Sequence, residues 1–152
     1  NAKMNEFCAI MGLCNLKHID TMLEERKKRY EYYMDGLLNV NGIRFFNKNI
    51  ETTNNYAYFP IIIEDEYGLS RDELYEKLKE NNIYSRKYFY PLTSDQACFK
   101  NKYKNEDLDC ARELAKKIIV LPFYEKMEYG TIQEIIRIVQ FDNCEKKIGR
   151  IY

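Results

Sequence analysis

The sequence is poor in the residues that divide a chain into separate parts. Its 152 residues include three Pro and six Gly, and the glycines are scattered, so the sequence has no Gly-rich phosphate-binding loop and no flexible linker. It has no internal repeat and no low-complexity stretch. No apolar run approaches the roughly 20 residues that a membrane span requires. The sequence therefore predicts one compact unit with short connections.

Cysteine and histidine also lack the patterns typical of disulfide and metal sites. The five Cys form no CxxC pair and their number is odd, which is typical of a reduced intracellular protein, so we expect a cytoplasmic location. His18 is the one histidine, and Cys8 and Cys14 lie six residues apart, a poor spacing for metal ligands. We therefore expect no metal site.

An excess of charge of either sign is missing as well. Lys plus Arg total 24 and Asp plus Glu total 24, so the formal net charge is zero. Because dedicated nucleic-acid-binding domains usually carry a basic excess, we expect no nucleic-acid partner. With 45% hydrophobic residues, a chain of this length can enclose one hydrophobic core.

The hydrophobic periodicity predicts helices that alternate with short strands. The expected order is helix, strand, strand, helix, strand, helix, helix, at residues 5–39, 43–46, 56–63, 70–80, 83–90, 105–118 and from 131 onward. Two adjacent strands and a third after a helix indicate an α+β fold, with a small mixed or mainly antiparallel sheet and helices on one face. Pro60 cannot donate to a sheet ladder and predicts an edge strand or a bulge.

The first helix is unusually long for so small a domain. A helix over residues 5–39 is about three times the usual length, so we expect it to bridge two bodies, with Gly12 as its weakest point. Gly42 tolerates the left-handed conformation that ends a helix. Ser70 and Glu73 have the spacing of a capping box and predict where the second helix begins.

The most unusual polar pattern lies in the third predicted strand. Two-residue alternation would place Arg86, Tyr88 and Tyr90 on one side of an extended segment over residues 83–90. An Arg flanked by two Tyr hydroxyls can contact a phosphate or the hydroxyls of a sugar. The alternative interpretation is an edge strand with a polar outer face, and spacing alone leaves both open.

Three stretches of the chain carry a family resemblance. Residues 1–13 begin Asn-Ala-Lys-Met and end Gly-Leu, residues 83–92 read Ile-Tyr-Ser-Arg-Lys-Tyr-Phe-Tyr-Pro-Leu, and residues 121–124 read Leu-Pro-Phe-Tyr. In order and spacing they resemble the motifs of DegT-type sugar aminotransferases, which are PLP-dependent enzymes of the aspartate aminotransferase superfamily. The departures from those motifs are modest: Ala2 replaces an aromatic residue and Lys3 replaces Arg.

The resemblance implies the small C-terminal domain of a fold type I aminotransferase. Residues 1–40 would be the bridging helical segment and residues 41–152 the small domain. The large domain, which carries the PLP-binding lysine in the family, would be absent, and no lysine here matches that position. The resemblance therefore implies that pyridoxal 5′-phosphate is the cofactor of the full-length parent, and that this chain alone is inactive, does not bind PLP and has no catalytic residue.

The resemblance also implies contacts and partners. In the family, the loop around Asn1 and Lys3 reaches across a homodimer toward the PLP phosphate, so these two residues are implied cofactor contacts. Arg86, Tyr88 and Tyr90 would line the nucleotide-sugar site. The Tyr-Phe-Tyr-Pro form is similar to enzymes that aminate a dTDP-linked 4-keto-6-deoxy sugar, with glutamate or glutamine as amino donor, in polysaccharide or glycan precursor biosynthesis.

A second hypothesis is a non-catalytic binding or interaction module. The first predicted helix carries apolar residues that a large domain would otherwise cover, namely Phe7, Ile10, Met11 and Leu13. Exposed apolar patches of this kind favour association.

Overall fold

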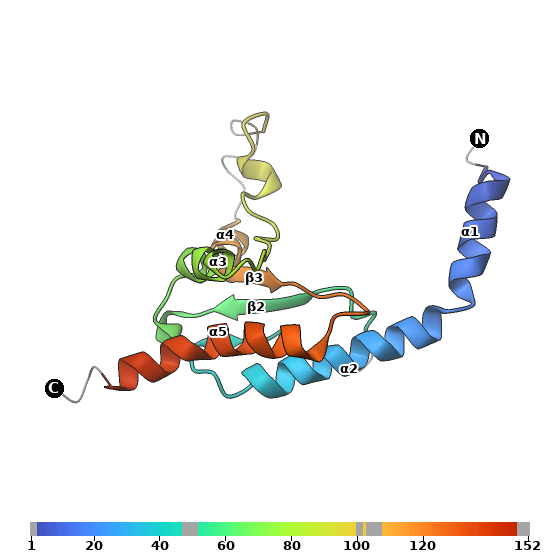
Figure 1. Cartoon of the computed structure of the whole chain (residues 1–152). Helices are drawn as coiled ribbons and strands as arrows, with labels where there is room; N and C mark the ends of the chain where they lie inside the picture. The colour runs from blue at the N-terminus through green and yellow to red at the C-terminus, as the bar shows by residue number, and fades with distance from the viewer. Residues whose placement is uncertain (1–2, 47–51, 100–101, 103–107, 149–152) are drawn as a thin grey trace.

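The computed structural model describes residues 3–46, 52–99, 102 and 108–148, with side chains described as far as residue 140. Five α-helices, three strands and two short 3-10 helices follow one another along these residues (Figure 1). Their order is α1 (Glu6–Leu16), α2 (Ile19–Leu37), β1 (Ile43–Arg44), β2 (Phe59–Ile63), η1 (Asp65–Tyr67), α3 (Arg71–Glu80), η2 (Thr93–Asp95), α4 (Asp109–Lys117), β3 (Ile118–Leu121) and α5 (Tyr129–Ile148).

The three strands form an antiparallel sheet in the order β1-β2-β3, which confirms the α+β prediction. Phe59 pairs with Leu121 and Ile61 pairs with Ile119, so these side chains share one face of the sheet. Helices α2, α3 and α5 cover that face and complete one core, and α2 and α5 lie side by side (Figure 1). Their buried contributions are Tyr33, Leu37, Leu74, Leu78, Ile132, Ile135, Ile136 and Val139.

The third strand is not the one that the sequence predicts. Residues 83–90 were expected to be extended, but in the structure only Arg86 pairs with the sheet, through an isolated bridge to Val120. The third strand is instead Ile118–Leu121, whose first residue the periodicity assigns to the predicted helix over residues 105–118. The run Ile-Ile-Val favours extended backbone, and its burial between β2 and the segment of Arg86 overrides the helical periodicity that α4 carries as far as Lys117.

Pro60 lies in the central strand, so the prediction of an edge strand is wrong, and the register explains how the sheet accommodates it. Val120, opposite Pro60, exchanges both of its backbone hydrogen bonds with Arg86 on its other side. The sheet therefore needs no backbone hydrogen bond from Pro60 to β3. β1 pairs with Ile62 and Ile63 and ends before it reaches the level of Pro60, so a missing N–H there removes no ladder bond.

The long first helix divides into two. The break falls at Lys17 and His18, where the amide of His18 bonds the carbonyl of Asn15, rather than at Gly12. α1 stands apart from the body of the molecule (Figure 1), and none of its residues, all of which are described, is buried. α2 belongs to the body: Arg29 donates to the carbonyl of Met127 at 2.7 Å, which ties α2 to the start of α5.

Two predicted local signals are confirmed. The backbone amide of Ser70 donates to Glu73 Oε2 at 2.6 Å, and the Glu73 amide donates to Ser70 Oγ at 3.3 Å, which completes the capping box of α3. Gly42 has a positive φ of 77°, although it lies beyond the last turn of α2. A Cβ at Gly42 would approach the backbone nitrogen of Tyr67 to 1.9 Å, so this turn needs glycine for space as well as conformation.

We predict that Gly42→Ala destabilises the fold and that Gly12→Ala does not. At Gly42 the new methyl group meets backbone atoms of η1, so we expect a loss of at least about 1–3 kcal/mol from strain alone. At Gly12 a Cβ meets nothing within 4 Å among the described residues, and Ala favours helix there. Urea unfolding followed by far-UV circular dichroism measures both, and equal stability of the two variants would contradict the packing described here.

Candidate functional site

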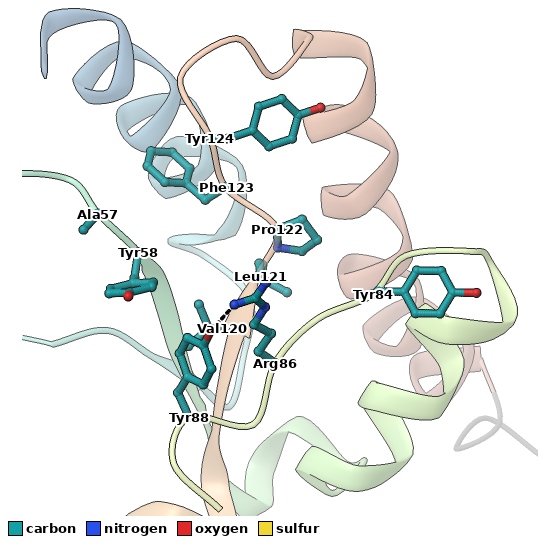
Figure 2. A pocket seen from close by; sticks show the side chains of 10 residues that line it. All are labelled: Ala57, Tyr58, Tyr84, Arg86, Tyr88, Val120, Leu121, Pro122, Phe123 and Tyr124. Carbon is teal, nitrogen blue, oxygen red and sulfur yellow. Dashed lines mark hydrogen bonds between the residues drawn. The ribbon is translucent and has the colours of Figure 1, made fainter. Parts of the chain in front are cut away.

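A pocket of about 360 Å³ lies where three segments of the chain meet (Figure 2). One segment leads into β2, the second is the stretch that bridges to β3, and the third is the end of β3 with the loop after it. Together these segments combine one cation with several aromatic rings. The lining residues are Ala57, Tyr58, Tyr84, Arg86, Tyr88, Val120, Leu121, Pro122, Phe123 and Tyr124.

Arg86 is the positive charge of the pocket. Its backbone exchanges hydrogen bonds of 2.9 and 2.8 Å with Val120, so the sheet fixes its position. Its guanidinium donates to the hydroxyl of Tyr88, and the two side chains lie together at the pocket wall (Figure 2). That hydrogen bond raises the pKa of Arg86 further above its ordinary value. Arg86 therefore offers a permanent cation with donors left for an anionic ligand.

Four of the residues that line the pocket are tyrosines. Tyr58 meets Tyr88 edge to face with ring centroids 5.6 Å apart, so the two rings make a corner beside Arg86. Tyr58 and Tyr124 are each more than half exposed, whereas the ring of Tyr84 points away from this corner (Figure 2). Aromatic faces suit planar or sugar-like apolar surfaces, and the hydroxyls can bond polar groups at the rim. The arrangement suits a ligand that is both anionic and rich in hydroxyls.

Tyr90 lies apart from Arg86 and Tyr88. The chain turns after Arg86, and the amide of Tyr90 bonds the carbonyl of Lys87 at 2.9 Å, so two-residue alternation does not continue. The ring of Tyr90 packs 4.8 Å from the guanidinium carbon of Arg71. The structure thus brings together two of the three predicted substrate contacts, and the role of all three stays a prediction.

The predicted cofactor contacts, Asn1 and Lys3, precede α1 in the sequence, and Lys3 is not among the residues that line this pocket. Asn1 lies outside the described residues, and Lys3 is exposed just before α1. No lysine among the described residues is buried. The described residues also hold no cluster of three side chains suited to a metal ion, and none of their helices has the length and apolar character of a membrane span.

Tyr58 and Tyr124 line the pocket but are not among the predicted site residues. Tyr58 belongs to the aromatic run that predicted a strand, and Tyr124 ends the Leu-Pro-Phe-Tyr motif that contributed to the resemblance. Both signals were present in the sequence. Only the pairing of β2 with β3 brings these two residues to the same pocket as Arg86.

Comparison with known families decides the relationship. Residues 1–140 match the DegT/DnrJ/EryC1/StrS aminotransferase family. The chain belongs to this family. An Escherichia coli relative, dTDP-4-amino-4,6-dideoxy-D-glucose transaminase, is 40% identical over 141 residues, which is 91% of this chain and 38% of the relative. The Shigella dysenteriae protein of the same name is 35% identical over 140 residues, 92% of this chain and 38% of its own length.

Solved structures support the same fold. DesI, crystallised in the presence of its TDP-sugar product, aligns with a TM-score of 0.83 at 22% identity over 99% of this chain and 39% of DesI. PseC from Helicobacter pylori, an aminotransferase involved in pseudaminic acid biosynthesis, aligns with a TM-score of 0.79 at 16% identity over 92% of this chain and 38% of PseC. The chain thus spans less than two fifths of the length of these proteins.

Proposed function

We propose that this chain is the C-terminal part of a PLP-dependent aminotransferase that acts on a keto-deoxy nucleotide sugar. The observation that carries the proposal is 40% identity, across nearly the whole chain, to a transaminase whose name specifies a dTDP-linked amino sugar. The pocket around Arg86 supports it, because a nucleotide sugar presents a diphosphate, sugar hydroxyls and a planar base. The substrate would be a dTDP-4-keto-6-deoxy sugar used in polysaccharide biosynthesis.

Within that enzyme, this chain would supply binding and orientation rather than the covalent chemistry. PLP acts as the electron sink in amino transfer, and the protein orients the substrate toward it. Arg86 and Tyr88 would hold the diphosphate, while Tyr58 and Tyr124 would contact the base or the sugar. Glutamate or glutamine would be the amino donor, and the reaction would take place in the cytoplasm.

The proposed assembly is a homodimer in which each subunit completes the other's cofactor site. Residues 1–40 would connect the small domain, residues 41–152, to a PLP-binding domain. Asn1 and Lys3 would then reach the PLP phosphate of the partner subunit, since an amide donor and an ammonium group both suit a phosphate. The exposed apolar side chains of α1 are consistent with a surface that the rest of such an enzyme covers.

We predict that Arg86→Gln weakens binding of dTDP at least tenfold. Hydrogen bonds to a charged group contribute about 1.5–3 kcal/mol, and Gln keeps a polar side chain but removes the charge. The chain has 14 Tyr and no Trp, so a dTDP titration followed by tyrosine fluorescence reports on the pocket directly.

Arg137→Gln is the matched control, because Arg137 is an exposed cation on α5 and does not line the pocket. We expect Arg137→Gln to bind dTDP as the unchanged chain does. A titration in which the unchanged chain shows no saturable response, or in which both variants bind equally well, would contradict the assignment of the pocket.

A second candidate function, that of an interaction module, is favoured by the exposure of α1. Phe7 is 83% exposed and Leu16 65% exposed, and Met4, Ile10, Met11 and Leu13 are each more than half exposed. Burying a large apolar side chain contributes about 1.5–3 kcal/mol. Because so much apolar surface is rare on a free helix, we propose that α1 mediates association of this chain in solution.

We predict that the double variant Phe7→Asn, Ile10→Asn weakens self-association more than tenfold and leaves the free energy of unfolding of the body unchanged. Neither side chain is buried, so neither contributes to the core. Sedimentation equilibrium measures the association. Leu38→Asn, at an exposed apolar position outside α1, is the control. An unchanged chain that stays monomeric at high concentration would contradict this role for α1.

A further inference from the structure

The segment that carries Arg86 and Tyr88 is held to the sheet at one residue. Arg86 and Val120 exchange two backbone hydrogen bonds, and this bridge is isolated, so no ladder continues from it through the described residues. Beyond Arg86 the chain turns, and residues 87–90 no longer belong to the sheet. Side-chain contacts must therefore decide how this segment lies over the pocket.

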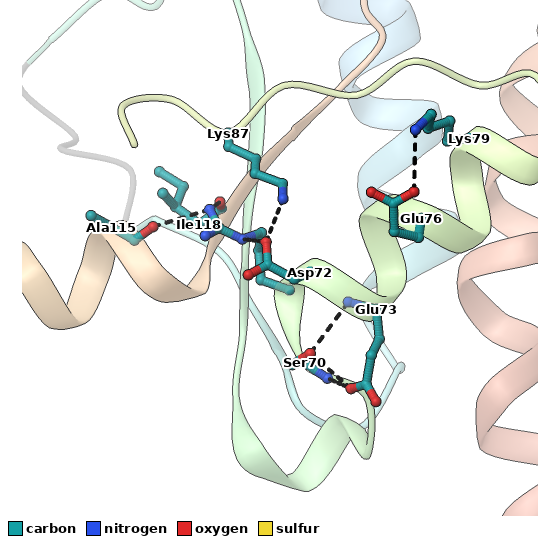
Figure 3. A network of polar contacts seen from close by, with 9 residues as sticks. Ser70, Asp72, Glu73, Glu76, Lys79, Lys87, Ala115 and Ile118 are labelled. Carbon is teal, nitrogen blue, oxygen red and sulfur yellow. Dashed lines mark hydrogen bonds and ion pairs between the residues drawn. The ribbon is translucent and has the colours of Figure 1, made fainter. Parts of the chain in front are cut away.

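The first such contact joins Lys87 to α3. The ammonium nitrogen of Lys87 lies 2.5 Å from Asp72 Oδ1 on α3 (Figure 3). It also lies 4.3 Å from the ring centroid of Tyr75, on the same helix. Lys87 is only 26% exposed, so this pair is better shielded on the lysine side than a free surface pair. Since Arg86 and Tyr88 line the pocket, the lysine between them points in another direction, toward α3.

The second contact runs through Arg71, the residue next to Asp72. Arg71 is buried, and its guanidinium donates to the carbonyls of Ala115 and Ile118 at 3.1 and 3.2 Å. Its Nε lies 2.8 Å from Asp72 Oδ1, and the Tyr90 ring packs against its guanidinium. Asp72 thus bridges a cation fixed in the core to a cation on the pocket segment.

We propose that Asp72 is a positioning residue that holds residues 86–90 against α3, so that Arg86 and Tyr88 stay at the pocket wall. The ligand in question is a nucleoside diphosphate, and this part of the inference rests on the proposed function. Asp72 does not line the pocket. It acts directly through Lys87, and also through Arg71 and Tyr90. Its replacement therefore alters no side chain that lines the pocket but loosens the segment that carries Arg86 and Tyr88.

The physical reason is preorganisation. Arg86 is exposed and hydrogen bonds to Tyr88 two residues away, so both must be placed together for the pair to face a diphosphate. A segment that is already ordered loses less conformational entropy on binding than one that the ligand must order. Asp72 provides that order from α3, a helix that is anchored in the core by Leu74 and Leu78.

The experiment uses the unchanged chain, Asp72→Asn, Asp72→Glu and the control Glu76→Gln. Asn has the shape of Asp but lacks its charge, and Glu restores the charge. Glu76 lies on the same helix and pairs with Lys79 at 3.3 Å, away from the pocket segment. Limited digestion with trypsin reports on the segment, because Arg86 and Lys87 are cleavage points within it.

We expect Asp72→Asn to be cleaved after Arg86 or Lys87 about three to ten times faster than the unchanged chain, with Glu76→Gln unchanged and Asp72→Glu largely rescued. Cleavage after Arg137 in α5 serves as the internal reference, since general unfolding would accelerate it equally. Binding of dTDP by Asp72→Asn should weaken by a similar factor. Equal cleavage of Asp72→Asn and the unchanged chain, or acceleration at Arg137 to the same extent, would overturn the inference.

The ligand arm separates this inference from the proposed function. If the unchanged chain does not bind dTDP but Asp72→Asn still opens selectively at Lys87, the positioning of the segment stands and the proposed ligand is wrong. If the unchanged chain binds dTDP and Asp72→Asn opens but binds equally well, Asp72 does not position the binding groups and the inference fails.

Discussion

The two backbone hydrogen bonds between Arg86 and Val120 are the constraint on which the pocket depends. They place a cation from a non-strand segment at the edge of β3, at the level where Val120 lies opposite Pro60 of β2. The pairing of β2 with β3 brings the tyrosine before β2 and the loop after β3 to the same pocket, and the bridge adds Arg86 to it. Three short strands can hold the pocket in place because the central strand packs into a core to which α2, α3 and α5 all contribute.

The charged residues of this protein act through local ion pairs and not through an overall net charge. The chain is neutral overall, and most of the ion pairs of the described residues lie on exposed surfaces, where they contribute little to stability. One chain of contacts starts at a buried cation and runs from Arg71 through Asp72 to Lys87. The hydrogen bond from Lys87 holds the pKa of the Asp72 carboxyl below its usual value, so Asp72 is ionised at neutral pH. One carboxylate thereby connects the core to the segment of the pocket.

Local sequence signals predicted the parts of the fold that local physics decides. The capping box at Ser70 and the left-handed Gly42 follow from propensity and spacing. The strand predicted over residues 56–63 is confirmed only from Phe59 to Ile63, because Tyr56 has a positive φ. The choice between residues 83–90 and Ile118–Leu121 as the third strand does not follow from propensity and spacing, because both are rich in strand-forming residues. Burial against β2 selects the apolar run, and contacts with Asp72 and Arg71 turn the other segment away from the sheet.

The same distinction applies to the site. Arg86 and Tyr88 could be predicted from their residue types, but Tyr90 could not be separated from them without knowing that the chain turns after Lys87. Family membership follows from the match over residues 1–140, whereas the substrate is a proposal that the pocket chemistry supports. In the proposed enzyme, this chain would bind and orient the substrate, and a PLP-binding domain would supply the cofactor.

Amino transfer by the proposed full-length enzyme tests the account most directly. The enzyme, loaded with PLP, would be given glutamate and a dTDP-4-keto-6-deoxy sugar, and the products followed by mass spectrometry. The account predicts formation of the dTDP-linked amino sugar, with a large loss of kcat/KM for the nucleotide sugar when Arg86 is replaced by Gln. No amino transfer to this class of substrate, or full activity in the Arg86→Gln enzyme, would contradict it.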